Sequence, residues 1–279
     1  MNDLTVFHFN KGEKNFEDYA QANGGLCWFA RDLAVMLGYE SYAAFQNAVN
    51  KATRACLTLS IPVAENFTQV DREIDGKIVK DWKLSRFACY LTAMNGDVKK
   101  PKVAAAQAYF ATLAQAFSKY IQNAGNVERV LIRGEVSERE RSLSGVAQEA
   151  GVEVYAFFQN AGYRGMYNMN LSALKEVKGV NSARPLLDFM GKEELAANLF
   201  RITQTEARIK NEGIRGQFRL EATAEHVGKR VRATMQELSG TAPEDLPIAD
   251  DIRTVQKGLK KTQKEFARLD TQNPHVPKP

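Results

Sequence analysis

Apolar residues recur with two different periods along this chain of 279 residues, and the change of period separates predicted strands from predicted helices. Near the N-terminus, residues 4–9 alternate and residues 26–29 form a short apolar run, which predicts two short strands. Residues 72–83 alternate around Asp75-Gly76. Because Asp-Gly is a preferred two-residue hairpin turn, this segment is predicted to be a β-hairpin.

Spacings of three and four residues between apolar positions predict helices through most of the remaining chain. One helix follows Pro101, a residue that favours the first helical turn, and carries an apolar face from Val103 to Tyr120. Other helices are predicted to start at residue 30 and to cover residues 84–94, 128–142, 193–210, 221–239 and 252–269. The aromatic, glycine-punctuated segment at residues 162–167 is predicted to be a turn.

The order of these elements predicts an α+β fold in two parts. Residues 1–124 contain the strands and should form a small antiparallel sheet with helices. Residues 125–270 should form a mainly α-helical domain, which starts after the break at Ala124-Gly125. Residues 271–279 contain three prolines and are expected to be a disordered tail.

A heptapeptide repeat marks both parts of the chain. Residues 42–48 (YAAFQNA) return with one change at residues 155–161 (YAFFQNA). The likeness extends back, at the same offset, to Gly38 and Gly151. In each copy a small residue lies four positions before the glycine, and apolar residues flank it. This pattern is typical of a helix-turn-helix, in which the glycine adopts the left-handed turn conformation.

The second helix of each copy would carry a Gln-Asn pair: Gln46 with Asn47, and Gln159 with Asn160. These amides can bond adenine through two hydrogen bonds in the major groove, so they are candidate nucleic-acid-binding residues. The alternative is a packing role, in which the aromatic residues of the repeat anchor the core and the Gln-Asn pair is the exposed remainder. The repeat therefore indicates two related helical elements, and base reading is one interpretation of them.

The charge distribution favours a polyanionic partner. The net charge is +5 and the isoelectric point is about 9.0. Residues 201–232 hold eight Arg or Lys against four Glu, and residues 253–268 hold six against one, whereas residues 237–251 are acidic. Basic segments of this kind are typical of nucleic-acid-binding proteins.

Two short clusters of cations are the candidate phosphate contacts. Their members are Lys99, Lys100 and Lys102 in the first cluster and Lys229, Arg230 and Arg232 in the second. The first surrounds a predicted helix N-terminus, where the macrodipole and the backbone N–H groups attract anions; a solvated lysine loop is the alternative. In the second, the first and last residues would share a helix face.

The remaining residue types give no support to catalysis or to a metal site. Three cysteines without a C-x-x-C pair favour a reducing compartment, and three isolated histidines provide no ordinary zinc site. Glu73 and Lys77 lie on opposite strands of the predicted hairpin, so a cross-strand ion pair explains them better than a nuclease site. Phosphate-binding and nucleophile motifs are absent from the sequence. We therefore expect no enzyme, no cofactor and no metal.

The sequence predicts a soluble cytoplasmic protein that has no membrane partner. The first ten residues lack the basic-then-apolar layout of a signal peptide, and no apolar run reaches about 18 residues. No pattern in the sequence indicates an oligomeric state.

Several motifs, in order along the chain, resemble a known family. Residues 28–33 (WFARDL), 37–39 (LGY) and 84–91 (LSRFACYL) resemble the BRO N-terminal domain, an α+β DNA-binding module of viral and phage proteins. The motifs that follow are residues 95–97, 100–101, 158–163, 194–201, 203–206, 228–232, 236–238 and 243–247. Together these segments resemble the bacterial DNA-damage-inducible protein D family over residues 26–247.

The resemblance implies a BRO-like N-terminal domain and a non-enzymatic protein of the DNA damage (SOS) response. In that family the suggested target is the recombinase filament on single-stranded DNA, which the protein antagonises. Two rival hypotheses are a transcription regulator or phage antirepressor that binds duplex DNA, and an adaptor that binds only proteins. The family provides no agreed binding residues, so the candidate sites rest on the residue patterns above.

Overall fold

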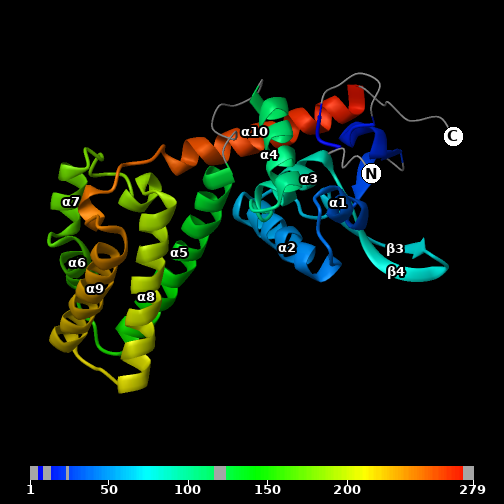
Figure 1. The fold of residues 1–279 in the computed structure, drawn as a ribbon. Coiled ribbons are helices and arrows are strands. Elements are labelled where there is room, and N and C mark those ends of the chain that lie inside the picture. The colour runs from blue at the N-terminus through cyan, green and yellow to red at the C-terminus, as the bar shows by residue number, and fades with distance from the viewer. Residues whose placement is uncertain (1–5, 9–13, 23–24, 116–123, 273–279) are drawn as a thin grey trace. The chain divides into compact units, whose positions relative to one another are not determined.

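A computed structural model describes residues 6–8, 14–22, 25–115 and 124–272, and these residues divide into two compact units (Figure 1). Unit 1 contains the described residues up to Leu131 together with those from Thr254 onward. Unit 2 is Ile132–Arg253. The divisions fall within helices α5 (Ala124–Glu149) and α10 (Ile252–Gln272), and the boundary that the sequence predicts at residues 124–125 is at the start of α5.

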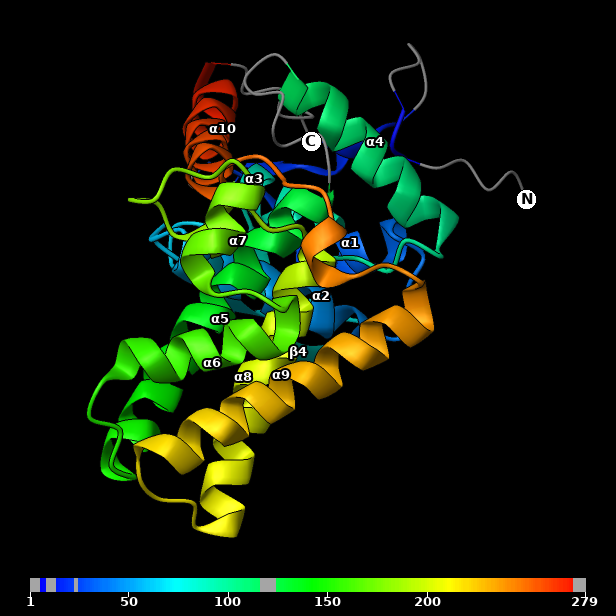
Figure 2. The same ribbon diagram turned by 90° about the vertical axis from the view of Figure 1, so that its left-hand side faces the viewer.

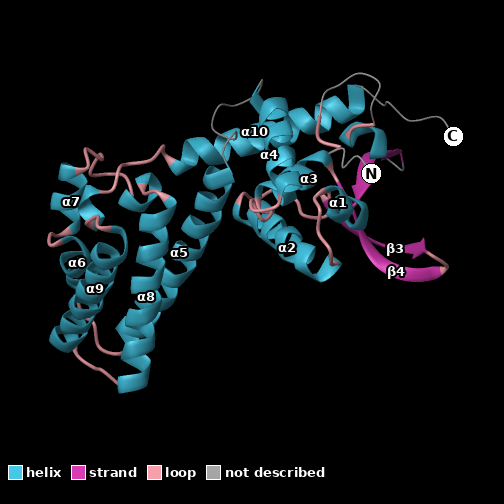
Figure 3. Ribbon diagram, in the orientation of Figure 1, coloured by secondary structure: helices cyan, strands magenta, loops and turns pink. Residues whose placement is uncertain are grey.

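Unit 1 contains a four-stranded antiparallel sheet, which confirms the predicted α+β fold (Figure 3). Its strands are β1 (Gln21–Ala22), β2 (Leu26–Phe29), β3 (Phe67–Ile74) and β4 (Lys77–Leu84), in the order β1-β2-β4-β3. Strands β3 and β4 form the predicted hairpin. Asp75 and Gly76 have φ angles of 51° and 73°, and positive φ at both central residues is what a type I′ turn requires.

Helices α1 (Ala30–Met36), α2 (Tyr42–Thr58), α3 (Arg86–Met94) and α4 (Pro101–Gln115) complete unit 1, together with the short 3-10 helix η1 (Phe16–Tyr19). Every residue of α3 is buried, so this helix forms the centre of the core. Phe16 and Trp28 stack beside it with ring centroids 4.5 Å apart, and the Trp28 indole donates to the Phe16 carbonyl at 2.9 Å.

Helix α10 packs its apolar face in unit 1, although the sequence assigns it to the helical domain. Its buried side chains include Val255, Leu259 and Phe266, and the ring of Phe266 meets that of Tyr90 edge to face at 6.0 Å. Asp270 forms an ion pair with Arg86 at 2.6 Å. The residues that make these contacts are far apart in the sequence, so hydrophobic periodicity predicts helix α10 but not the residues against which it packs.

The regular elements of unit 2 among the described residues are all helices, as predicted (Figure 2). Besides most of α5, it contains α6 (Tyr155–Tyr167), α7 (Leu171–Val177), α8 (Lys192–Glu212) and α9 (Gln217–Ser239). The 3-10 helices η3 (Leu186–Phe189) and η4 (Pro243–Asp245) join them. Its core is built from buried residues of all the long helices, with Phe158, Tyr163, Tyr167, Leu195 and Ile202 among the largest.

The predicted turn at residues 162–167 is wrong, because this segment is the second half of α6. Its glycines serve a close crossing with α9. A Cβ atom at Gly165 would lie 2.1 Å from the Glu225 carbonyl oxygen, and one at Gly228 would lie 2.7 Å from the Gly162 carbonyl oxygen. Glycine is therefore required there by the neighbouring backbone, and not by a turn.

Two further predictions fall largely outside the described residues. Of the strand predicted at residues 4–9, only Val6–His8 are described, and they are not in a strand. Of the tail predicted at residues 271–279, the first two residues end α10 and the rest lie outside the described residues.

Candidate nucleic-acid interface

The turn between α1 and α2 fixes the direction in which α2 leaves it. Gly38, with a φ of 72°, donates its backbone N–H to the Val35 carbonyl at 3.0 Å, and Tyr39 donates to the Ala34 carbonyl at 2.9 Å. Ser41 then caps the first turn of α2 through its side-chain oxygen. Side-chain caps of this kind satisfy a backbone N–H that the helix itself leaves unpaired.

Four polar residues of α2 share one exposed surface, here called the α2 face. They are Gln46, Asn47, Asn50 and Lys51. Spacings of three and four residues make them neighbours on the helix. Across the described part of the chain, none of these side chains forms a hydrogen bond or ion pair within the protein. Their donors and acceptors are therefore open to a ligand.

The α2 face contains both residues of the first Gln-Asn pair that the sequence predicts, and two more. Asn50 and Lys51 lie four residues after Gln46 and Asn47 and extend the polar surface by one turn. Sequence reasoning missed them, although their spacing from the predicted outward pair was a sufficient signal.

Salt bridges and a buried carboxylate attach α1 and the start of α2 to the hairpin. Asp81, which is fully buried, accepts from the Arg31 backbone N–H at 3.1 Å, and Arg72 pairs with Asp32 at 2.8 Å. The Arg31 guanidinium lies 4.1 Å from the centre of the Tyr42 ring. Burial and the charge of Asp81 raise the pKa of Tyr42, against an opposing effect of Arg31. These contacts hold the α2 face in a fixed orientation on unit 1.

The first lysine cluster contacts the α1–α2 turn. The Lys100 ammonium donates to the Gly38 carbonyl at 3.1 Å and lies 5.2 Å from the centre of the Tyr39 ring. The hydrocarbon chain of Lys102 packs against Gly38, and Lys99 is exposed. The sequence separates these lysines from the repeat, but the fold places two of them against the turn of its first copy.

The start of α4 already has a carboxylate of the chain beside it. The Lys99 backbone N–H donates to Asp97 Oδ1 at 3.0 Å, and the Lys100 N–H donates to the Asp97 carbonyl at 3.0 Å. An acidic side chain at a helix N-terminus compensates the macrodipole there. Asp97 thus takes part of the role that the sequence assigns to a bound phosphate.

The turn of the second copy matches that of the first, but the helix after it is placed differently. Gly151 donates to the Gln148 carbonyl at 3.0 Å and Val152 to the Ala147 carbonyl at 2.9 Å, the same two bonds at the same offset. Helix α6, however, is mostly buried between its neighbours. Asn160 Oδ1 accepts from the Leu171 N–H at 2.9 Å at the start of α7.

The second Gln-Asn pair therefore lacks the open position of the first. Gln159 and Asn160 are both half-buried, and the amide of Asn160 is used inside unit 2. In unit 2 the repeat forms a packing element.

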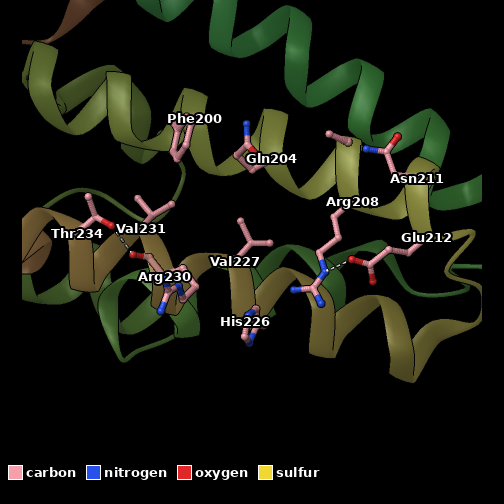
Figure 4. A pocket seen from close by; sticks show the side chains of 11 residues that line it. Phe200, Gln204, Arg208, Asn211, Glu212, His226, Val227, Arg230, Val231 and Thr234 are labelled. Carbon is pink, nitrogen blue, oxygen red and sulfur yellow. Dashed lines mark hydrogen bonds and ion pairs between the residues drawn. The ribbon is translucent and has the colours of Figure 1, made fainter.

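The three residues of the second cation cluster lie in three different environments. Arg232 binds Glu244 with both terminal nitrogens, one of them at 2.6 Å, and its side chain is only 14% exposed. Lys229 pairs with Glu225 at 2.7 Å. Arg230 is exposed beside a groove between α8 and α9 (Figure 4). Of the three predicted phosphate contacts, Lys229 and Arg230 are exposed and Arg232 is occupied by Glu244, and a role in phosphate binding stays a prediction.

The groove between α8 and α9 has a volume of about 490 Å³. Figure 4 shows apolar side chains, among them Phe200 and Val227, together with polar ones such as Gln204 and His226. Arg208 pairs with Glu212 at 2.9 Å across one end of it.

Other predicted or excluded chemistry can be located in the described residues. On the hairpin, Glu73 faces Ile78, and the cross-strand ion pair is formed by Lys80 and Asp71 at 2.7 Å. Within the described ranges, no group of His, Cys, Asp or Glu is arranged to hold a metal ion. Burial raises the pKa of the Cys56 thiol to about 12. No helix in the described part of the chain is long and apolar enough to cross a membrane.

Comparisons with known proteins match both units. The family described as "BRO family, N-terminal domain" matches residues 18–111, and the "DinD C-terminal domain" matches residues 123–255. The chain is 37% identical over 273 residues to DNA damage-inducible protein D of Escherichia coli (strain K12), with 92% of this chain and 100% of that protein covered. The chain belongs to the DNA damage-inducible protein D family.

Proposed function

We propose that this protein acts in the DNA-damage response as a non-enzymatic binding protein that modulates recombination by binding the recombinase filament, its DNA, or both. Its family supports the biological setting, since the E. coli relative is named for induction by DNA damage. The α2 face supports the contact with DNA. The recombinase as target comes from the family resemblance of the sequence.

The single observation that supports DNA binding is that the α2 face is exposed on a helix whose orientation is fixed by its contacts with the rest of unit 1. Gln and Asn side chains hydrogen-bond base edges, and a lysine beside them can neutralise a phosphate. Turn hydrogen bonds hold α2 to α1, and Asp81 holds α1 to the hairpin, so α2 loses little conformational freedom on binding. Unit 1 therefore presents the residue types and the rigidity that a DNA-reading helix needs.

A duplex-binding transcription regulator is the second candidate function. The outward position of α2 after a glycine turn favours it, because a recognition helix of this kind enters the major groove of duplex DNA. It differs from the first proposal in its preferred form of DNA.

One titration separates these functions. The full-length protein would be titrated against labelled single-stranded DNA, random duplex and recombinase-coated single strands, with fluorescence anisotropy as readout. Selective binding to the coated strands supports the first proposal, and duplex selectivity supports the regulator. Binding that is independent of nucleic acid contradicts both and favours the adaptor.

The α2 face can be tested in the same assay with Gln46→Ala combined with Asn47→Ala. Loss of two amides that contact DNA should lower the affinity about tenfold or more, since each well-placed contact of this type contributes about 1–3 kcal/mol. The matched control is Gln148→Ala with Gln236→Ala, which also removes two exposed helical amides. Equal affinities of the two double variants would refute a role for the α2 face.

A further inference from the structure

Helix α10 carries a row of lysines on the side opposite its buried apolar residues. This row, here called the α10 stripe, consists of Lys257, Lys260, Lys261 and Lys264, all exposed. Successive members are three, one and three residues apart, so they occupy one side of the helix over about two turns. With a rise of about 1.5 Å per residue, the stripe is about 10 Å long.

The lysines of the stripe have no acidic partner among the residues that the structure describes. In the described part of the chain, none of the four ammonium groups forms an ion pair or hydrogen bond. The acidic residues of the helix are used elsewhere, since Glu265 pairs with Arg268 at 3.2 Å and Asp270 pairs with Arg86 at 2.6 Å. The positive charge of the stripe is therefore left for an external anion.

We propose that the α10 stripe binds the phosphodiester backbone of DNA as a second contact surface, distinct from the α2 face. This inference rests on the proposed DNA-binding function and adds a site to it. One strand of DNA carries one charge per about 3.4 Å, so a stripe of about 10 Å spans roughly three phosphates. Lysine ammonium groups suit this role, because a point charge on a flexible chain needs no fixed ligand geometry.

The composition of α10 favours nucleic acid over an acidic protein. Protein interfaces are centred on apolar or aromatic anchors and are depleted in lysine. None of the large hydrophobic side chains described for α10 is exposed. A surface made of cations without an apolar anchor fits a phosphate backbone better than a folded partner.

The same feature argues against a membrane surface. A helix that binds a bilayer must insert an apolar face into it. In α10 that face, with Val255, Leu259 and Phe266, is buried in unit 1. The stripe therefore offers charge alone.

The stripe and the α2 face lie on different sides of unit 1. In Figures 1 and 2 α10 lies above α3, and α2 lies below it. Contacts at separate sites contribute independently to the free energy of binding. The two surfaces can thus be removed one at a time.

The test is DNA binding of the full-length protein with Lys260→Gln and Lys264→Gln, measured by anisotropy over a range of salt concentrations. Each phosphate contact adds about 0.9 to the slope of log K against log salt for duplex DNA and about 0.7 for single strands. The variant should show a slope smaller in magnitude by about 1.8 on duplex DNA and by about 1.4 on single strands. Extrapolated from equal affinities at about 1 M salt, these slopes give an affinity near 0.1 M salt that is about sixtyfold lower for duplex and about twenty-fivefold lower for single strands.

The matched control is Lys192→Gln with Lys210→Gln, which removes the same charge from exposed positions of α8. If the slope of log K against log salt becomes smaller in magnitude in both double variants, or in neither, the inference is wrong. Lys260→Arg with Lys264→Arg keeps the charge and should restore the slope. Thermal unfolding of all variants checks that the fold is unchanged.

The form of the ligand is resolved by using single strands, random duplex, recombinase-coated single strands and anionic phospholipid vesicles as separate probes. If the stripe variant loses only vesicle binding, the stripe is not a DNA surface. The same conclusion follows if the variant loses recombinase binding and keeps its DNA binding. If the wild-type protein binds no form of DNA, the proposed function itself fails. If it binds and the stripe variant matches the control, only the present inference fails.

Discussion

Glycines have two different uses at the scale of single residues in unit 2. Gly145 lies on the exposed side of α5, where an added Cβ meets nothing within 4 Å. Gly165 lies at the crossing of α6 and α9, where an added Cβ would meet backbone. The sequence marks both positions only as glycine, and the aromatic residues near Gly165 led to the prediction of a turn. What distinguishes the two is a partner sixty residues away.

Gly165→Ala should therefore destabilise the protein by about 3 kcal/mol, since overpacking typically costs 1–3 kcal/mol and the atom it meets belongs to the backbone. The change would be measured as a lower midpoint of urea unfolding. Gly145→Ala is the control, and it should be stabilising by about 0.5–1 kcal/mol because alanine favours the helix. Equal midpoints for the two variants would contradict the close crossing.

Arg232 has a structural task that the sequence does not reveal. Its guanidinium binds Glu244 and also donates to the Met166 carbonyl at 3.2 Å. Burial alone would raise the pKa of Glu244, but its bonds to Arg232 and its own backbone outweigh burial, so that the pKa is lowered. A lowered pKa gives stability that is present above the usual Glu range and is lost as pH falls through the lowered value.

Arg232→Gln should lower the unfolding free energy at pH 7 by about 2 kcal/mol, the typical contribution of a hydrogen bond to a charged group. The variant should also lose less stability than the wild type between pH 5 and about pH 3, because Glu244 no longer has a charge partner. Urea unfolding at a series of pH values measures both effects. Arg230→Gln, at an exposed position, should change neither, and a similar loss in that control would argue against the assigned role.

At the scale of elements, the repeat forms the same turn twice before its heptapeptide, but the helices that the heptapeptide begins, α2 and α6, present different surfaces. The backbone hydrogen bonds around Gly38 and Gly151 are equivalent, which the repeat itself predicts. What α2 and α6 expose depends on their neighbours, because α6 is covered by α7 and α9 while one side of α2 stays open. The local sequence therefore specifies the turn and the helix that follows it, and tertiary packing determines which residues of that helix are exposed.

A buried carboxylate on the hairpin, Asp81, is one of the groups that attach it to α1, beside the Arg72–Asp32 ion pair. Asp81 accepts hydrogen bonds from the Arg31 and Trp82 backbone N–H groups and from the Arg72 guanidinium. Asp81→Ala leaves these donors without their partner, so it should cost about 2–3 kcal/mol. Hydrogen exchange of the β3 and β4 amides should become faster.

Asp71→Ala provides the comparison for this variant. Asp71 is on the same hairpin and pairs with Lys80, but both side chains are more than half exposed. Exposed pairs contribute about 1 kcal/mol or less, so exchange should change little. If both substitutions accelerate exchange equally, Asp81 is not an attachment point.

At the scale of the whole molecule, the sequence predicts the elements well and their assembly in part. Hydrophobic periodicity and Asp75-Gly76 are local signals, and they identify the hairpin and most of the long helices correctly. The grouping of α10 with unit 1 is a long-range effect, since Phe266 meets Tyr90 and Asp270 meets Arg86. No local pattern encodes such contacts.

The candidate site is predictable to a similar degree. Gln46 and Asn47 lie on an exposed helical surface, as the sequence predicts, and their role in binding stays a prediction. Arg232 and Asn160 are polar residues that the sequence cannot separate from surface ones, because their partners Glu244 and Leu171 lie 11 or 12 residues away. Charge alone identifies cations, and only the fold shows which of them are already neutralised.

The placement of α10 in unit 1 also has a consequence for the order of folding during synthesis. The ribosome makes residues 132–253 before it reaches most of α10, so unit 2 leaves the exit tunnel as one continuous segment and can fold at once. Unit 1 begins first, but Tyr90 and Arg86 cannot make their contacts with Phe266 and Asp270 until those two residues have been added. The half of the protein that is translated first is therefore the half that is completed last, and its hydrophobic surface around α3 stays open while the rest of the chain is made.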